Sequence, residues 1–500
     1  MFEAFSSAAN AVWDVYSIGF VFLGCSIGLL FGALPGLGGV SALALVLPLT
    51  FGMDPLVAMI FYAAVMGAVP FGGSISAILL NTPGTAPNAA TCFDGHPMSR
   101  RGEANKALGI SATASGLGAL FGVIVLLVLL PLVRKVVLLF GPPEFLMLVL
   151  VGLTTVALAA RGNLLRGLMS GGIGILISLI GYSSVFGVLR FNFGSEYLWD
   201  GIELVPFLIG VFAVSELINY TLRGGKIAAE KVALAGRVFD GVKEVFRHKV
   251  CFFRSSAIGT CIGIIPGVGG AAANFIAYVT AKESSKHPET FGTGDPEGVV
   301  AAESSNNAKD GGALLPTVGF GIPGSAEMAV LLGGFILHGL APGPMLIKEH
   351  LDVVFALLLG LVFSNVIAST LGLFTANYLA KVTLVDVRYV TPVVLVLCFV
   401  GSYVMRGSIL DVMLALVGGI FGYGLIRFGF SPICLVIGYI LGDLAETAFH
   451  QSLMISRGSY MIFFSRTISV VLFLCLVVVL VFPFVRARSG RKGAVKHEAG

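Results

Sequence analysis

Long apolar stretches separated by short polar segments run along almost the whole chain. They lie near 17–33, 107–133, 143–160, 167–189, 204–222, 352–380, 391–405, 409–426, 430–445 and 466–485. A helix needs roughly 20 residues to cross a bilayer, and most of these stretches reach or approach that length. Together with the interrupted apolar segments between them, they predict an all-α polytopic membrane protein with about 10–12 transmembrane helices.

Two of the apolar segments are interrupted by the same motif. Residues 35–39 read Pro-Gly-Leu-Gly-Gly, and residues 266–270 read Pro-Gly-Val-Gly-Gly. In both copies two further glycines precede the motif at the same spacing, Gly28 with Gly32 and Gly259 with Gly263. Many transporters build their substrate site from paired discontinuous helices near the bilayer midplane. The duplicated motif therefore predicts two broken membrane helices and indicates a transporter.

A second proline-glycine motif follows each break, at 81–85 and at 321–325. Each lies between short apolar pieces, 74–80 with 86–93 and 313–320 with 326–337. About ten residues of helix rise roughly 15 Å and cannot cross a core of about 30 Å. The pattern predicts two re-entrant hairpins or half-helix pairs with the proline-glycine dipeptides at their tips. Such backbone is tolerated at membrane depth only where it is buried in protein or lines a wet cavity.

A polar, basic stretch divides the chain into two halves of similar length. The predicted organisation is a first transmembrane half at 1–222, a basic cytoplasmic linker at 223–254, a second half at 255–485 and a basic cytoplasmic tail at 486–500. Both basic segments are placed in the cytoplasm because short cytoplasmic loops carry an excess of Lys and Arg.

The loops that follow the two hairpins differ in charge. The loop at 94–106 is basic overall, whereas the loop at 343–352 has two acids and one lysine. The positive-inside rule places them on opposite sides of the membrane. The two halves are therefore predicted to have inverted topology, which permits alternating access by movement of one part against another.

The composition excludes several classes of protein. The chain is 56% hydrophobic and 12% charged, whereas soluble domains carry about 25% charged residues. The net charge of +4 is small, and no basic stripe interleaved with aromatics points to nucleic acid. No metalloprotease, Walker-type or nucleophile-elbow motif occurs. We therefore expect a protein that is not an enzyme, has no cofactor, and draws its energy from an ion gradient.

The breaks themselves are candidate ion sites. An unwound segment frees backbone carbonyls that suit Na⁺, and the helix N-termini beside it suit an anion. The glycines proposed to line cation-binding backbone are Gly36, Gly38, Gly267 and Gly269. The alternative is that these glycines only allow tight helix packing.

The hairpin tips are the candidate substrate site. Their hydroxyls and amides can hydrogen-bond a carboxylate without a buried arginine. The substrate-binding candidates are Ser74, Ser76, Asn81, Thr82, Pro83, Gly84, Thr85, Gly321, Pro323, Gly324 and Ser325. The alternative is that the Ser and Thr side chains cap short helices.

A polar run at 303–310 lies between the second break and the second tip. On a helix, Glu303 and Asn307 lie four residues apart on one face, and Asn306 lies three from Glu303. A carboxylate with two carboxamides is a candidate cation or proton site, because hard cations prefer oxygen ligands and ionisable groups within membranes are usually functional. The alternative is a solvated surface helix that continues the polar loop before it.

At these motifs the chain resembles the large membrane subunit of the tripartite tricarboxylate transporter family. The resemblance rests on residues 32–39, 72–85, 141–145, 303–308, 321–326 and 456–458. It departs from the family pattern at 69–71, where a tyrosine-containing run is usual, and at 442–446, where a paired-acid ending is usual.

The resemblance implies a secondary transporter of the bacterial inner membrane that takes up citrate or other carboxylates with Na⁺ or H⁺. It also implies two partners, a periplasmic solute-binding protein and a small membrane subunit of about four helices. An elevator-type movement is a hypothesis that rests on the paired hairpins and the inferred inversion. The competing class is a passive anion channel or pore, which also uses broken helices and glycine-rich filters.

Overall fold

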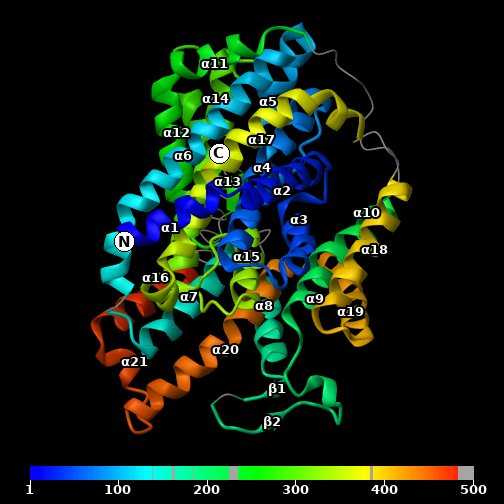
Figure 1. The fold of residues 1–500 in the computed structure, drawn as a ribbon. Coiled ribbons are helices and arrows are strands. Elements are labelled where there is room, and N and C mark those ends of the chain that lie inside the picture. Colours follow the sequence, from blue (N-terminus) through cyan, green and yellow to red (C-terminus); the bar gives the residue numbers. More distant parts are fainter. Residues whose placement is uncertain are drawn as a thin grey trace, which may run out of the picture. The chain divides into compact units, whose positions relative to one another are not determined.

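The fold is described from a computed structural model of the chain, which covers residues 1–137, 139–159, 164–183, 185–223, 235–267, 269–382 and 387–481. The predicted tail at 486–500 and part of the predicted linker lie outside these residues. The described chain is almost entirely helical, with one short antiparallel pair of strands, β1 (Gly181–Tyr182) and β2 (Leu189–Arg190) (Figure 1).

Eight helices in the described residues are long and apolar enough to cross a membrane. They span 15–33, 55–80, 86–137, 204–222, 351–382, 389–406, 409–427 and 432–455. Five further apolar helices are shorter, at 38–50, 142–158, 164–178, 326–337 and 467–481. The predicted all-α polytopic fold is confirmed. The long spans are fewer than the helices expected because breaks and tips divide several apolar segments.

The chain forms two compact units, Met1–Arg134 with Glu203–Phe428 and Lys135–Ile202 with Gly429–Gly500. The first unit begins with α1 (Phe2–Trp13), α2 (Val15–Ala33), α3 (Gly38–Val46), η1 (Leu47–Thr50), α4 (Pro55–Leu80), η2 (Ala86–Asn88), α5 (Ala89–Met98), η3 (Ser99–Glu103) and α6 (Ala104–Val137), whose last turn passes the boundary. It continues with α9 (Leu204–Leu208), η5 (Ile209–Val214), α10 (Ser215–Arg223), α11 (Val238–Arg247), α12 (Lys249–Ile264), α13 (Gly269–Ser284), η6 (Pro288–Thr290), α14 (Pro296–Phe320), α15 (Ala326–Leu337), α16 (Pro344–Glu349), α17 (Leu351–Val382), α18 (Val387–Arg406) and α19 (Ile409–Arg427). The first unit thus contains both breaks and both tips.

The second unit consists of α7 (Pro142–Ala159), α8 (Leu164–Ser178), the two strands, η4 (Glu196–Leu198), α20 (Pro432–Ile455), α21 (Ile462–Ser465) and the helix at 467–481. Two ion pairs tie its segments together. Arg190 donates to both carboxylate oxygens of Glu446 at 2.6 and 2.8 Å, which links β2 to α20. The buried Glu144 pairs with Arg466 at 2.8 Å and accepts a hydrogen bond from Ser469 at 2.9 Å.

The described part of the predicted linker is mostly helical. It contains α11 and the first turns of α12. α11 packs closely on α6, because Gly241 lies against the carbonyl of Lys106 and Gly109 lies against the carbonyl of Val238, with no room for a Cβ at either glycine. Which side of the membrane this segment faces stays a prediction.

Both predicted breaks are present. The first separates α2 from α3, and the second separates α12 from α13. Gly36 and Gly38 have φ of 95° and 53°, and Gly267 and Gly269 have φ of 81° and 77°. Glycine adopts this left-handed backbone without the steric penalty of a Cβ, so the motif itself turns the chain.

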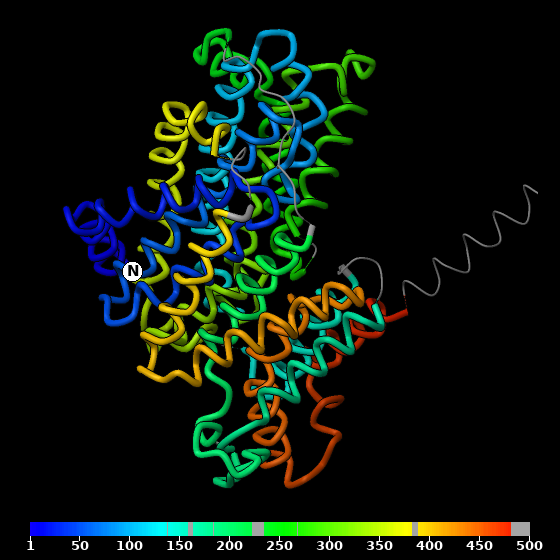
Figure 2. The backbone as a smooth tube through the Cα atoms, turned by 90° about the vertical axis from the view of Figure 1, so that its right-hand side faces the viewer, coloured from blue at the N-terminus to red at the C-terminus, as the bar shows by residue number. Residues whose placement is uncertain are grey.

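The helices before the two breaks pack in the same way. Gly28 and Gly32 bring α2 against the carbonyls of Val65 and Val69 in α4. The corresponding glycines of α12, Gly259 and Gly263, lie against the carbonyls of Ser305 and Lys309 in α14. Both views show the two regions side by side within the first unit, the first in blue and the second in green (Figure 1 and Figure 2). The orientation of the halves across a membrane stays a prediction.

The predicted length of the first arm of each hairpin is wrong. Residues 74–80 are the end of the 26-residue α4, and residues 313–320 are the end of the 25-residue α14. The glycines within these helices serve packing instead of breaking them, since Gly72 lies against the carbonyl of Leu29 and Gly312 against that of Thr260. Only the second arms, α5 and α15, are short.

Candidate functional site

The first tip, residues 81–85, lies beside both breaks. Gly84 packs directly on the carbonyl of Gly32, one turn before the first break. Pro87, just after the tip, lies beside Gly270 of the second break, where an added Cβ would be 2.9 Å from the proline Cγ. The amide of Asn274 in α13 donates to the carbonyl of Pro87 at 3.0 Å. The first tip therefore connects the two halves of the sequence.

The second tip makes the reciprocal contacts. The backbone N–H of Gly267 donates to the carbonyl of Gly324 at 3.1 Å, which joins the second break to the second tip. Glu327, in the first turn of α15, lies beside the first break, where a Cβ added to Gly39 would be 2.5 Å from Glu327 Oε1. Both breaks and both tips thus meet in one region of the first unit.

A buried lysine lies at this meeting point. Lys309 in α14 is 5% exposed. Its Nζ is 2.5 Å from Asp310 Oδ1 and 3.8 Å from Glu327 Oε2. Its stem lies against Gly270, where an added Cβ would be 2.5 Å from Lys309 Cδ. The region therefore combines a cation, two carboxylates, and the N-terminal ends of α3, α13 and α15.

Glu303 lies two turns before Lys309 in α14, and its carboxylate is enclosed by hydroxyl groups. It is 0% exposed. Ser74 donates at 2.8 Å, Ser111 and Ser115 donate at 2.9 Å, and Thr91 also donates to it. These donors come from α4, α5 and α6, so one side chain joins four helices. Ser111 and Ser115 lie on Oε2, Thr91 lies on Oε1, and Ser74 is within hydrogen-bond distance of both oxygens.

Comparison with known proteins identifies the family. The model of the tripartite tricarboxylate transporter TctA family matches residues 18–437. The chain belongs to the TctA family. It is therefore a large subunit of a tripartite tricarboxylate transporter and a multi-pass membrane protein, and the resemblance drawn from its motifs is confirmed.

Two relatives of this TctA-family chain come from Agrobacterium vitis. One, described as an uncharacterized 52.8 kDa protein in the TAR-I ttuC' 3' region, is 33% identical over 493 residues, which are 97% of this chain and 96% of the relative. The other, described as an uncharacterized protein in the TAR-II ttuC' 3' region, is 32% identical over 233 residues, 46% of this chain and 96% of that protein. No solved structure matches the chain.

The predicted substrate-binding hydroxyls of this TctA-family protein make mostly local hydrogen bonds. Ser76 donates to the carbonyl of Gly73 at 3.0 Å, and Thr82 donates to that of Leu80 at 3.1 Å. Thr85 donates to Asn88, and Ser325 caps α15 by accepting from the N–H of Met328 at 3.3 Å. The tips begin where Asn81 and Gly321 end α4 and α14 with φ of 53° and 71°. Pro83 and Pro323 lie within the tips, outside regular helix.

The reading of residues 303–310 as a solvated surface helix is wrong, because every one of these residues is buried in α14. The carboxamide of Asn307 donates to Asn365 of α17 at 2.6 Å. Both side-chain polar atoms of Asn306 are buried without a hydrogen-bond partner in the described chain. An amide that is buried without a hydrogen-bond partner costs free energy.

Several residues of this region are not among the candidates predicted from the sequence, namely Lys309, Glu327, Asn88, Thr91, Ser111 and Ser115. A signal existed for the first two. Lys309 is the lysine of the polar run at 303–310, between apolar segments, and Glu327 follows the second tip at the start of an apolar helix. Ionisable residues in such positions are functional candidates. The hydroxyl residues carried no signal, because Ser and Thr are common in membrane helices as packing residues.

Asp94 of α5 fastens the first hairpin to the start of α14. Its Oδ1 accepts hydrogen bonds from the N–H groups of Gly292, Gly294 and Asp295, each at 2.8 Å. Its Oδ2 accepts from the hydroxyl of Tyr278 at 2.8 Å. The carboxylate thereby connects α5, α13 and the loop before α14.

We expect Asp94→Asn to destabilise the protein by about 1–2 kcal/mol, because an amide loses the charge that strengthens these bonds and turns a donor toward Tyr278. Thermal unfolding of the purified protein in detergent measures the change. Asp240→Asn is the matched control, since Asp240 pairs with Lys243 at 3.9 Å on the surface, and such pairs contribute roughly 0–1 kcal/mol. Equal melting of the two variants would contradict the role given to Asp94.

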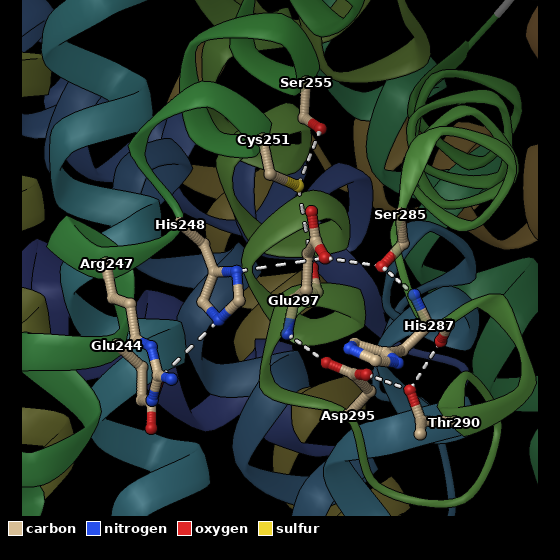
Figure 3. Close-up of polar contacts among 10 residues, drawn as sticks. All are labelled: Glu244, Arg247, His248, Cys251, Ser255, Ser285, His287, Thr290, Asp295 and Glu297. Atoms are coloured by element: carbon tan, nitrogen blue, oxygen red, sulfur yellow. Dashed lines mark hydrogen bonds and ion pairs between the residues drawn. The ribbon is translucent and has the colours of Figure 1, made fainter.

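A second polar cluster fixes the start of α14 (Figure 3). His248 lies 3.6 Å from Glu244 and 3.8 Å from Glu297, between α11 and α14. Ser285 donates to Glu297 at 3.0 Å, and Asp295 caps α14 by accepting from the N–H of Glu297 at 2.8 Å. The cluster positions the helix that carries Glu303 and Lys309.

A surface hollow of about 380 Å³ lies next to this cluster. Its lining residues are Glu103, Lys106, Asp240, Lys243, Glu244 and Arg247. Three acids and three bases face it, and they pair with one another, with Lys106 3.0 Å from Glu244. Because these charges balance, the hollow offers no excess of positive charge to a carboxylate.

Proposed function

We propose that this TctA-family subunit carries carboxylates across the bacterial inner membrane in symport with Na⁺ or H⁺. It works with a periplasmic solute-binding protein and a small membrane subunit of about four helices. The carboxylate class includes tricarboxylates such as citrate, and dicarboxylates. The observation that carries the proposal is the meeting of two helix breaks and two tips around a buried lysine.

The chemistry of the region supports binding of an anion. Helix N-termini present unpaired N–H groups and the positive end of the helix dipole. α3, α13 and α15 all begin at a break or a tip. Transporters commonly aim such half-helix ends at anionic groups of the substrate, while unwound carbonyls hold the coupling ion.

The coupling ion is proposed to bind near the breaks and α14. Gly36 and Gly267 supply backbone carbonyls outside regular helix, and Gly38 and Gly269 are the first residues of α3 and α13. Glu303, Asn306 and Asn307 supply buried oxygen atoms, of which those of Asn306 and Asn307 have no hydrogen-bond partner in the described chain. Oxygen ligands of this kind suit a hard cation such as Na⁺.

We further propose inverted halves and an elevator-type alternating access. The matching packing of α2 on α4 and of α12 on α14 supports two similar halves. A single cysteine at Thr85, in a background without native cysteines, tests the movement. Its labelling by a membrane-impermeant thiol reagent should change between the two sides of the membrane when substrate is added. Labelling from the same side in every condition would contradict the elevator proposal.

Accumulation of substrate tests the function itself. We expect proteoliposomes with the three components to concentrate radiolabelled citrate or succinate above its external level when an inward Na⁺ or H⁺ gradient is imposed. Collapse of both gradients with ionophores should stop accumulation. Uptake that only equilibrates would favour the passive anion pore, and no uptake of either compound would contradict carboxylate transport.

A further inference from the structure

The ammonium group of Lys309 lies closer to a carboxylate of its own helix than to the carboxylate of a neighbouring helix. Its neighbour in sequence, Asp310, is 2.5 Å from Nζ. The carboxylate from another helix, Glu327 of α15, is 3.8 Å away, beyond hydrogen-bond length. An ammonium group has three donors, and the Asp310 contact uses one of them. The lysine therefore keeps donor capacity at the place where the breaks and tips meet.

The backbone around Lys309 is shaped to admit its stem. Gly263 packs on the Lys309 carbonyl, and Gly270 leaves the space that the Lys309 side chain occupies. A Cβ at Gly270 would be 2.5 Å from Lys309 Cδ. The glycines of the second break thus place a long, buried, cationic side chain beside the N-terminal end of α13.

Glu327 is suited to move away from Lys309. Its side chain is 22% exposed, whereas those of Lys309 and Asp310 are 7% and 2% exposed. It extends from the first turn of α15, directly after the second tip, and its carboxylate reaches the first break at Gly39. The Glu327 carboxylate is only loosely paired with Lys309. The proposed substrate carries the same chemical group and can therefore take its place.

We infer that Lys309 binds one carboxylate group of a di- or tricarboxylate substrate, and that this group replaces Glu327. The inference rests on the proposed function and names its cationic residue. The second carboxylate of the substrate then meets the N–H groups at the beginnings of α3, α13 or α15. A monocarboxylate satisfies only one of these two partners and binds more weakly.

Equilibrium binding of radiolabelled citrate to the purified full chain tests this assignment, with succinate and benzoate as competitors. Lys309→Gln should weaken citrate binding by about 10-fold to 100-fold, because a charge-assisted hydrogen bond is lost. Glu327→Gln should bind citrate at least as tightly as the wild type, because the competing carboxylate is gone. Lys106→Gln, which removes a lysine paired with Glu244 at 3.0 Å, is the matched control and should bind normally.

The double variant Lys309→Gln/Asp310→Asn separates binding from folding, because it neutralises both members of the buried pair. We expect it to melt closer to the wild type than Lys309→Gln and still to bind citrate weakly. Wild-type citrate affinity in both variants would overturn the inference while leaving the proposed function intact. Failure of the wild type to bind citrate or succinate would count against both.

Discussion

Gly84→Ala is expected to abolish carboxylate uptake and to lower the melting temperature of the purified protein. A Cβ at Gly84 would lie 2.6 Å from Gly73 Cα and would collide with the carbonyl of Gly32. Both obstacles are backbone atoms of helices that are themselves packed, so neither can give way as a flexible side chain would. Overpacking of this kind typically costs about 1–3 kcal/mol. The tip would then separate from the first break.

The chain offers matched controls for this substitution. Gly19→Ala in α2 adds the same methyl group where nothing lies within 4 Å, so we expect a change within about 0.5 kcal/mol. Gly324→Ala adds it at the second tip, 2.7 Å from Ala313 Cα, and should resemble Gly84→Ala. Melting and uptake are measured on all three variants. A Gly84→Ala protein that melts and transports like Gly19→Ala would contradict the importance given to the contact of the tip with Gly32 and Gly73.

The breaks were predictable because their cause is local. A Pro-Gly-x-Gly-Gly sequence limits helix formation wherever it occurs, and the structure places Gly36 and Gly267 in left-handed conformations within it. The tips were predictable for the same reason. The lengths of α4 and α14 were not, because glycines such as Gly72 also occur inside helices where another backbone approaches closely.

The surroundings of α14 depend on contacts that sequence spacing does not reveal. Glu303 meets Ser111 and Ser115, which lie 192 and 188 residues away in the chain. Composition alone makes residues 303–310 resemble a solvated helix, since they combine charges, amides and serines. The packing of α12, α17 and the helices α4, α5 and α6 around α14 makes the segment a buried polar core.

Substitution of Glu303 is the second change for which we expect a large effect, here on folding. We expect Glu303→Ala to prevent stable folding, because it leaves the hydroxyls of Ser111 and Ser115, together with that of Thr91, without their acceptor, while Ser74 keeps the carbonyl of Pro70 at 2.9 Å. Each buried polar group left unpaired costs about 1–3 kcal/mol. Glu303→Gln keeps the volume, and its amide still pairs with hydroxyls that can rotate to accept as well as donate. The Gln variant should therefore fold.

If Glu303 contributes to the coupling-ion site, Glu303→Gln should raise the concentration of Na⁺ or H⁺ that gives half-maximal citrate uptake by about 10-fold. This is the effect of removing one charged ligand contact. Uptake is measured against Na⁺ concentration at fixed pH and against pH without Na⁺. Glu144→Gln is the matched control, because Glu144 is an equally buried acid held by Ser469 and Arg466 in the second unit. It should lower stability and leave the ion dependence unchanged. An unaltered ion dependence in a folded Glu303→Gln protein would show that Glu303 only holds four helices together. The coupling ion would then be expected to bind at the breaks.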